Sequence, residues 1–165
     1  MSLALVRVDD RLIHGQVLLG WGPVLEPARY VVVDDGMAAD PFERTLLEAS
    51  TGATPLEVLP LETAVSRLET LALASEPVIV LVRGLPEAAR LVAALARAGA
   101  APLAINLGGL HYAPGKTRVH DAVYLDHADR AALAAFGGLG VRVVVQDVPA
   151  TRPFDAPPEW REEPA

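Results

Sequence analysis

The stretch "VRVDDRLIHGQVLLGW", from Val6 to Trp21, changes from the pattern of a β-strand to that of a helix. Its first residues continue a short apolar run, whereas the apolar side chains after Gly15 recur with a helical period. A dense group of ionisable residues lies between the two patterns: Asp9, Asp10, Arg11 and His14. A strand that leads directly into a helix is the first half of a β-α-β unit, so this stretch sets the expectation for the fold.

Short strand patterns alternate with helical patterns along nearly the whole chain. Seven segments have the character of strands: residues 3–8, 30–33, 56–59, 78–82, 103–106, 122–125 and 141–146. They are continuously apolar, and several are rich in β-branched residues, which is typical of strands covered on both faces. We therefore expect a single-domain α/β fold with a mainly parallel, open twisted sheet of about seven strands and helices on both faces.

Helices are predicted between these strands, over residues 15–22, 41–49, 61–71, 86–99 and 127–136. Asp40 followed by Pro41 is a clear start signal, because aspartate caps the free amides and proline suits the first helical position. The helix after His14 is predicted to bury Leu18 and Trp21. We expect it to end at the Gly22-Pro23 pair, because proline interrupts the helical hydrogen bonds.

The composition excludes several classes of protein. The chain of 165 residues has a net charge of −7, whereas nucleic-acid binders usually carry a basic face. It has no cysteine, which removes disulfides, thiolate zinc sites and cysteine nucleophiles. No apolar run approaches the roughly 20 residues of a membrane span, and the N-terminus lacks the pattern of a signal peptide. We expect a cytoplasmic protein with no nucleic-acid partner and no direct membrane insertion.

The end of the chain differs in composition from the rest. The stretch "PATRPFDAPPEWREEPA" is rich in proline and acidic residues. We expect one folded domain over residues 1–149 and an irregular acidic tail over residues 150–165. Phe154 and Trp160 are the side chains in this tail that can dock on the domain.

The ionisable cluster lies where a parallel α/β sheet places its ligands, beyond the carboxyl end of a strand. His14 is suited to nucleophilic attack on phosphorus, because a neutral imidazole has a free ring nitrogen. Arg11 can offer paired donors to phosphate oxygens, and the free amides of Gly15 and Gln16 at the helix start attract anions. Asp9 or Asp10 can hold the proton of the other ring nitrogen.

Two further stretches lie at predicted strand ends. In "VVVDDG", Asp34 and Asp35 follow a strand, and we expect Asp34 to lie beside the His14 loop, while Asp35 suits a tight turn. In "NLGGL", Asn106, Gly108 and Gly109 follow another strand, and the glycine amides can form an anion nest. The other histidines match no compact metal-ligand spacing, so we expect no metal and no cofactor.

Four colinear stretches resemble one known family. "RVDDRLIHGQV" is similar to the signature R-[IV]-D-D-R-[LF]-I-H-G-Q-[VI] of the IIB subunits of the mannose/fructose/sorbose family of the sugar phosphotransferase system (PTS). "ARYVVVDDGMAADPFERTLL" resembles that family's second strand and following helix. "AINLGGLHYAPGKTRV" resembles its I-N-V-G-G-M-x-x-x-x-G-K-x-x-[IV] segment, with Leu110 in place of methionine. "LGVRVVVQDVP" resembles the last strand, so the resemblance extends over about residues 3–149.

The resemblance implies a protein-phosphohistidine–sugar phosphotransferase. In such a protein His14 accepts a phosphoryl group on Nδ1 from a IIA protein. It then passes the group to a sugar bound by the membrane subunits IIC and IID, and these subunits hold the protein at the membrane periphery. We assign phosphate stabilisation to Arg11 and orientation of the imidazole to Asp10. Gly15, Gln16, Asp34, Asn106, Gly108 and Gly109 are expected to form the surrounding loop, and Arg29 to face the IIA partner.

Two other interpretations remain open on the sequence alone. A regulatory phosphocarrier that is phosphorylated on His14 without transporting a sugar would need the same residues. A nucleotide-binding α/β enzyme is the other alternative, although the chain has neither a P-loop nor a dinucleotide-binding turn. The sequence specifies neither the sugar nor the oligomeric state.

Overall fold

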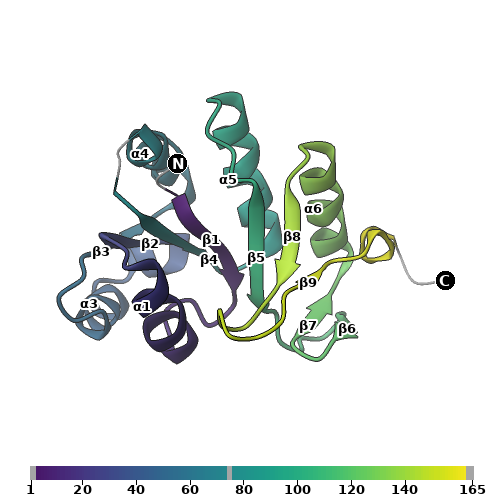
Figure 1. Ribbon diagram of the computed structural model, residues 1–165, viewed down its shortest axis with the longest axis horizontal. Helices are drawn as coiled ribbons and strands as arrows, with labels where there is room; N and C mark the ends of the chain where they lie inside the picture. Colours follow the sequence, from purple (N-terminus) through teal and green to yellow (C-terminus); the bar gives the residue numbers. More distant parts are fainter. Residues whose placement is uncertain (1–2, 74–75, 163–165) are drawn as a thin grey trace.

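A seven-stranded sheet forms the centre of the protein, with the strand order β3-β2-β4-β1-β5-β8-β9 (Figure 1). The computed structural model describes residues 3–73 and 76–162. The first six of these strands are parallel, and only β9 runs antiparallel to its neighbour β8. The strands are β1 (Leu3–Asp9), β2 (Arg29–Val33), β3 (Leu56–Leu59), β4 (Val78–Val82), β5 (Ala104–Gly109), β8 (Arg142–Val145) and β9 (Phe154–Asp155).

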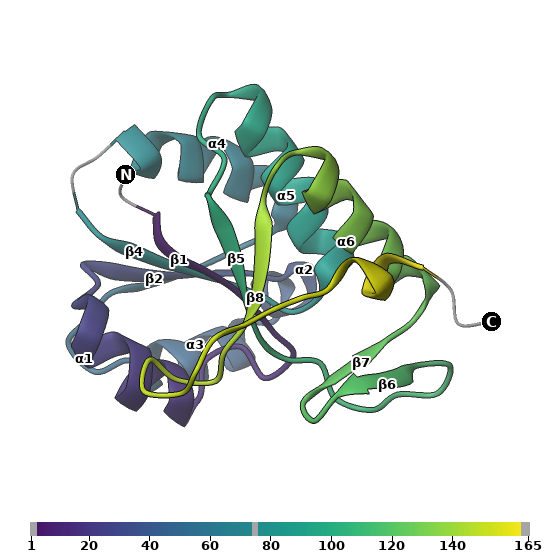
Figure 2. The same ribbon diagram turned by 45° about the vertical axis from the view of Figure 1, so that its right-hand side comes forward.

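Helices cover both faces of the sheet, as the continuous apolar strand patterns predicted (Figure 2). One face packs against α4 (Leu61–Leu73), α5 (Leu85–Arg97) and α6 (His127–Gly138). The other face packs against η1 (Gln16–Trp21), α1 (Gly22–Leu25), α2 (Asp35–Ala39) and α3 (Pro41–Ser50). All five residues of β4 are buried, because this strand lies inside the sheet with a helical layer on each side.

The parallel arrangement brings several strand ends to one edge of the sheet. β1 lies between β4 and β5, and its last residue, Asp9, aligns with Gly109 of β5. Val33 at the end of β2 aligns with Val82 at the end of β4. The loops that follow these four strands therefore share the carboxyl edge, where α/β sheets bind their ligands.

One predicted strand lies outside the main sheet. Residues 122–125 contribute β7 (Val123–Leu125), which pairs antiparallel with β6 (Thr117–His120) in a separate two-stranded sheet. Figures 1 and 2 show this hairpin below the end of β5 and β8. We did not predict β6, whose first two residues are exposed and whose polar sequence lacks an apolar run. The seventh strand of the main sheet is β9 instead.

The helix after His14 continues beyond the point where we expected it to end. Its first six residues form a wide π-helical turn, and an α-helical turn follows directly and reaches Leu25. Pro23 is tolerated because it lies in the first turn of α1, where the missing amide is least costly. The predicted helix after Asp40 is confirmed, and the Asp40 carboxylate accepts hydrogen bonds from the amides of Phe42 and Glu43.

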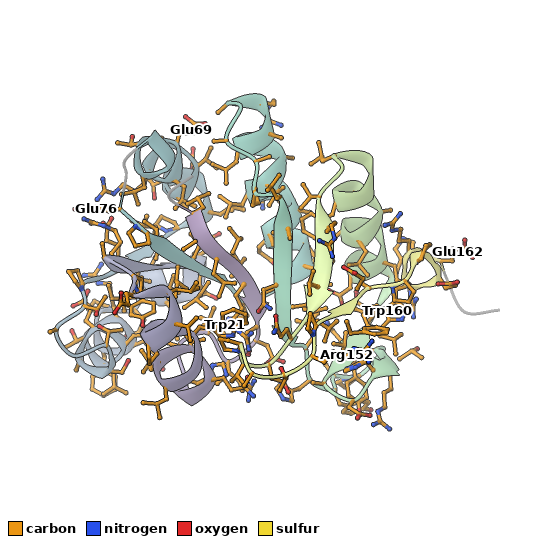
Figure 3. The ribbon with its side chains drawn as sticks, viewed as in Figure 1. Trp21, Glu69, Glu76, Arg152, Trp160 and Glu162 are labelled. Atoms are coloured by element: carbon orange, nitrogen blue, oxygen red, sulfur yellow. The ribbon has the colours of Figure 1, made fainter. Side chains whose placement is uncertain are left out.

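The C-terminal segment is more ordered than the irregular tail that we expected. Phe154 pairs with Val145 of β8, and the short helix η2 (Pro158–Arg161) packs against α6. Trp160 is buried, with its ring 5.9 Å from Phe154 and 6.3 Å from His120 (Figure 3). The last residues of the expected tail, 163–165, lie outside the described residues. Within the described residues, no helix has the length and apolar character needed to cross a membrane.

Replacing Trp160 by alanine tests whether the segment stabilises the domain. Because the indole is buried, we expect the Trp160→Ala variant to lose about 3 kcal/mol of the free energy of unfolding in urea. Phe42→Ala is the matched control, because Phe42 is 73% exposed, and it should change stability by less than about 0.5 kcal/mol. Equal unfolding midpoints for the parent and Trp160→Ala would show that the segment contributes nothing.

Candidate active site

The carboxylate of Asp9 is the centre of the site. It ends β1, is fully buried, and accepts a hydrogen bond of 2.8 Å from Nη2 of Arg7. The same carboxylate accepts hydrogen bonds of 3.1 Å from the backbone amide and from Nε of Arg11. Asp9 therefore joins a buried arginine of the sheet to a partly exposed arginine of the loop.

Arg7 is fully buried within the sheet, and our sequence reasoning did not select it. Its guanidinium also donates to Oδ1 of Asn106, to the carbonyl of Gln146 at 2.9 Å and to Oε1 of Gln16 at 3.0 Å. Burial lowers the pKa of this guanidinium, and the charge of Asp9 opposes that change. The signal in the sequence was an arginine inside the apolar run "LALVRVDD", where an unpaired charge would be costly.

Gly108 makes room for the Arg7 guanidinium. A β carbon at position 108 would lie 2.0 Å from Cζ of Arg7, far inside contact distance. Asn106, on the same strand, holds Arg7 from the side and donates to the carbonyl of Gln146. We expected both residues in the loop around His14, but the structure places them beneath it, as support for the buried arginine.

Arg11 is the cation of the site that solvent can reach, with 39% of its side chain exposed. Its Nη2 donates to Oε1 of Gln16 at 3.0 Å and to Asp9 at 3.3 Å. Among the described residues, its Nη1 has no hydrogen-bond partner. Since Arg7 already neutralises Asp9, the positive charge of Arg11 is available to an incoming anion.

His14 lies at the surface of this cluster with 17% of its side chain exposed. Its Nδ1 is 2.9 Å from the carbonyl of Leu12, and its Nε2 is 3.3 Å from Oε1 of Gln16 and 3.6 Å from Oδ2 of Asp9. All of these partners are acceptors, so a ring nitrogen makes a hydrogen bond to them only when it carries the proton. The neutral ring carries one proton, and the other nitrogen then has its lone pair directed at an acceptor.

Leu12 directs the backbone that holds His14. Its φ of 53° lies in the left-handed region, which is uncommon for a residue other than glycine. The side chain is fully buried, and its amide donates to the carbonyl of Asp9 at 3.0 Å, so packing and a tight turn maintain this conformation. Strained residues of this kind often occur at functional sites.

The backbone around Gly15 is open to solvent. No atom lies within 4 Å of the position that a β carbon of Gly15 would occupy. The carbonyl of His14 accepts hydrogen bonds from the amides of Val17 and Leu18, whereas within the described part of the chain the amides of Gly15 and Gln16 make none. These two amides and Arg11 are thus donors that can bind an anion beside His14.

Asp10 points away from His14, contrary to the role we assigned to it. Its carboxylate is 2.7 Å from Nδ1 of His111 and accepts the backbone amide of His111, also at 2.7 Å. Asp9 is the carboxylate beside the His14 imidazole. Asp34 lies beside the loop at Asp10, because Arg83 bridges the two residues: its Nε donates to Asp34 at 2.6 Å and its Nη1 donates to the carbonyl of Asp10 at 3.0 Å.

Two of the remaining predicted residues take different positions. Gly109 ends β5, and its carbonyl accepts the amide of Asp10 at 3.1 Å, so it lies beside the loop as expected. Arg29 lies at the opposite edge of the sheet, because it aligns with Val78, as does Leu3 at the start of β1. Because Val82, four residues further along β4, aligns with Val8, the level of Arg29 is about five residues, or about 17 Å, from that of Asp9. Arg29 binds Glu57 there at 2.6 Å.

Within residues 3–73 and 76–162, no group of three or more histidine, aspartate or glutamate side chains could hold a metal ion. The site is instead a paired cluster of charges, with one imidazole at its surface and hydrogen-bond donors beside it. Such an arrangement can bind an anion and orient a histidine toward it.

Comparisons with known proteins point to one family. A family model described as "PTS system sorbose subfamily IIB component" matches residues 3–159. The chain is 34% identical over 152 residues to the sorbose-specific EIIB component of Klebsiella pneumoniae, covering 89% of this chain and 90% of that protein. It is 33% identical over 150 residues to the mannose-specific EIIAB component of Escherichia coli K12, covering 90% of this chain and 45% of that protein.

A solved structure shares the fold. The IIBSor domain of the sorbose permease from Klebsiella pneumoniae has a TM-score of 0.83 and 30% sequence identity, covering 94% of this chain and 93% of that chain. This likeness confirms the α/β fold with a mainly parallel sheet that the sequence predicted.

Two glycine substitutions test whether Arg7 needs the space that Gly108 leaves. We expect Gly108→Ala to lower the free energy of unfolding by at least about 2 kcal/mol, because the new methyl group displaces a buried, paired guanidinium. Gly15→Ala is the matched control, because the new methyl group would meet open space. It should change stability by no more than about 0.5 kcal/mol. Chemical denaturation measures both, and equal stability of the two variants would contradict this account of Gly108.

The ion pairs of Glu57, on β3, predict that the stability of the protein depends on pH. Hydrogen bonds from Arg67 and then from Arg29 lower the pKa of Glu57 from its ordinary value of 4.5, although burial opposes them. This stabilisation is present above the unfolded-state pKa and is lost as the pH falls through the lower folded-state pKa.

Glu57→Gln should therefore be less stable than the parent by about 1 kcal/mol at pH 7. The difference should shrink as the pH falls below about 4.5, where glutamate itself becomes neutral in the unfolded chain. Unfolding at a series of pH values measures the difference. A gap that stays constant down to pH 3 would show that the charge of Glu57 is not its cause.

Proposed function

The chain belongs to the sorbose subfamily of IIB components of the phosphotransferase system, and on this premise we propose that His14 carries the phosphoryl group. The protein is thus a phosphotransferase, the phosphoryl-transfer subunit of a sugar phosphotransferase system. The observation that carries the assignment of His14 is its place at the surface of a cluster in which Arg7 neutralises Asp9 and leaves Arg11 to the phosphate.

The phosphoryl group arrives on a histidine of a IIA protein. A nitrogen of His14 attacks the phosphorus, a new N–P bond forms, and the N–P bond to the donor histidine breaks. The donor nitrogen keeps the electron pair, so no metal ion is needed to complete the exchange. Catalysis then consists mainly of positioning the two imidazoles and stabilising the charge of the transferred group.

Nδ1 is the nitrogen that we assign to this attack. Nε2 faces the Asp9 carboxylate and Oε1 of Gln16, whereas Nδ1 faces only the neutral carbonyl of Leu12. The negative carboxylate favours the proton on Nε2. Nδ1 then has the lone pair, which becomes available when the ring turns away from Leu12.

Three groups stabilise the phosphohistidine in this proposal. Arg11 donates from Nη1, which has no hydrogen-bond partner in the described part of the chain, and the amides of Gly15 and Gln16 donate from the start of the helix. Asp9, rather than Asp10, holds the imidazole through Nε2. Gly109 shapes the loop beside Arg11, while Asn106 accepts a hydrogen bond from Arg7 and Gly108 leaves room for its guanidinium.

The partners follow from the same premise. One relative is named a mannose-specific EIIAB component, whose name joins a IIA unit to the IIB unit that this chain matches. We propose that a IIA protein donates the phosphoryl group and that membrane subunits IIC and IID present the accepting sugar. These contacts would place the protein at the membrane periphery, in the cytoplasm. The relatives are named for different sugars, sorbose and mannose, so the sugar of this system is a matter for experiment.

Phosphorylation by a IIA donor tests the site. We expect an acid-labile phosphate on His14, detected by mass spectrometry, and ³¹P NMR should identify the Nδ1 adduct. His14→Ala should abolish labelling, and Arg11→Ala should slow it at least about tenfold, since a charge-assisted hydrogen bond is lost. Arg90→Ala is the matched control, because Arg90 is exposed on α5, the layer on the other side of the sheet.

Two outcomes would contradict the proposal. Phosphate on another histidine of the parent protein would refute His14 as the acceptor, and equal rates for Arg11→Ala and Arg90→Ala would refute the role of Arg11. A separate assay with membranes that contain the cognate IIC and IID subunits then tests transport. Phosphate that never reaches a sugar in those membranes would support the regulatory alternative.

A further inference from the structure

Asp10 holds His111 at two points, and the proposed transfer has so far used neither residue. One carboxylate oxygen of Asp10 accepts the backbone amide of His111, and the other is 2.7 Å from its Nδ1. A carboxylate beside Nδ1 fixes the proton on that nitrogen and sets the plane of the ring. The family segment that this stretch resembles leaves position 111 unspecified, so the resemblance gives His111 no role.

The His111 ring and the Arg11 guanidinium both approach Gly109. Cε1 of the ring and Nη2 of Arg11 lie 3.4 Å and 3.6 Å from the same point, the position that a β carbon of Gly109 would occupy. Cε1 joins Nδ1 to Nε2, so both ring nitrogens are one bond away from the atom that approaches this point. The His111 side chain is 53% exposed, and among the described residues Nε2 has no hydrogen-bond partner.

We propose that His111 is a second histidine of the phosphoryl site, which donates a hydrogen bond from Nε2 to the phosphoryl group on His14 when its ring is protonated. This inference rests on the proposed function of His14. No covalent bond to His111 is involved: Asp10 accepts from Nδ1, and the phosphoryl oxygen accepts from Nε2. His111 would thus add a charge that depends on pH to the permanent charge of Arg11.

The charges around His111 explain why phosphorylation and protonation should be coupled. Nδ1 of the ring contacts the carboxylate of Asp10, and Cε1 approaches the same point near Gly109 as Nη2 of Arg11. It also lines a cavity of about 550 Å³ whose other charged side chains are Asp34, Asp35, Arg83, Glu87, Lys116, Asp126 and Asp129. Several of these are already paired, Arg83 with Asp34 and Lys116 with Asp129.

The phosphoryl group is the one new charge that enters this environment during the reaction cycle. Its two negative charges would offset the repulsion between protonated His111 and Arg11. By linkage, a proton on His111 then favours the phosphorylated protein, and the phosphoryl group favours the proton to the same degree. The protein should therefore hold its phosphate better at pH 6 than the same protein without this imidazole.

The test uses the intact protein phosphorylated with phosphoramidate, a small donor that requires no partner protein. Mass spectrometry first measures the phosphate on His14. The rate of phosphate loss is then measured from pH 6 to pH 9 for the parent, His111→Ala, Asp10→Asn and the control His127→Ala. His127 is the first residue of α6, and its replacement controls for the loss of one histidine.

We expect His111→Ala to lose phosphate about three- to tenfold faster than the parent at pH 6, and at an equal rate at pH 9. The lower limit allows for the solvent exposure of the ring, which weakens a charge-assisted hydrogen bond. Asp10→Asn should change in the same direction, and His127→Ala should follow the parent. A ratio of His111→Ala to parent that equals one at every pH would overturn the inference.

Ring ¹⁵N NMR of the parent gives a second measurement that needs no variant. The His111 titration midpoint should move to higher pH when His14 is phosphorylated, and an unchanged midpoint would overturn the inference. Phosphate on His111 itself would also overturn it, because the ring would then be an acceptor. If the parent takes no phosphate on His14, the proposed function fails as well, whereas phosphate on His14 with a flat ratio contradicts His111 alone.

Discussion

The bonding of Asp9 between Arg7 and Arg11 is the interaction on which the rest of the site depends. A buried carboxylate is costly unless it is paired, and here it has one arginine beneath it in the sheet and another beside it in the loop. The pairing fixes the end of β1, the turn through Leu12 and the position of the His14 ring at once. The active loop therefore takes its shape from the interior of the sheet.

The same three charges suit the proposed function, in which the site binds a phosphoryl group and then transfers it. Two arginines and one aspartate leave a single net positive charge near His14, with part of the Arg11 side chain in solvent. A deeper set of cations would hold a phosphoryl group more tightly and would slow its departure. Partial exposure also leaves the imidazole within reach of another protein, which a relay between proteins requires.

The sequence predicted the fold well because the relevant signals are local. The bounds of β3 and β4 were predicted to the residue, since each is a short apolar run between clear breaks. The hairpin of β6 and β7 was misplaced because pairing partners depend on contacts distant in the chain. The sequence marked Trp160 only as an aromatic residue in a polar tail. Its burial was not predictable, because it depends on the surface of α6.

Within the site, His14 and Arg11 were recognisable from the sequence, but the roles of their neighbours were not. Asp9 and Asp10 are adjacent and chemically identical, and only the direction of each side chain at the end of β1 separates the one beside His14 from the one on His111. Arg29 was expected to face the IIA partner, and its place before a strand puts it at the amino end of the parallel strands. Arg7 was overlooked because its partners come from β5 and from the segment after β8.

The lack of a side chain at Gly108 limits which substitutions positions 7 and 108 can accept during evolution. The guanidinium of Arg7 occupies the space that any larger residue at position 108 would need. Neither position is free to vary alone, although residues 8–107 lie between them in the chain. Where a smaller residue replaces the buried arginine, position 108 has room for a larger side chain. We therefore expect the two positions to covary among relatives.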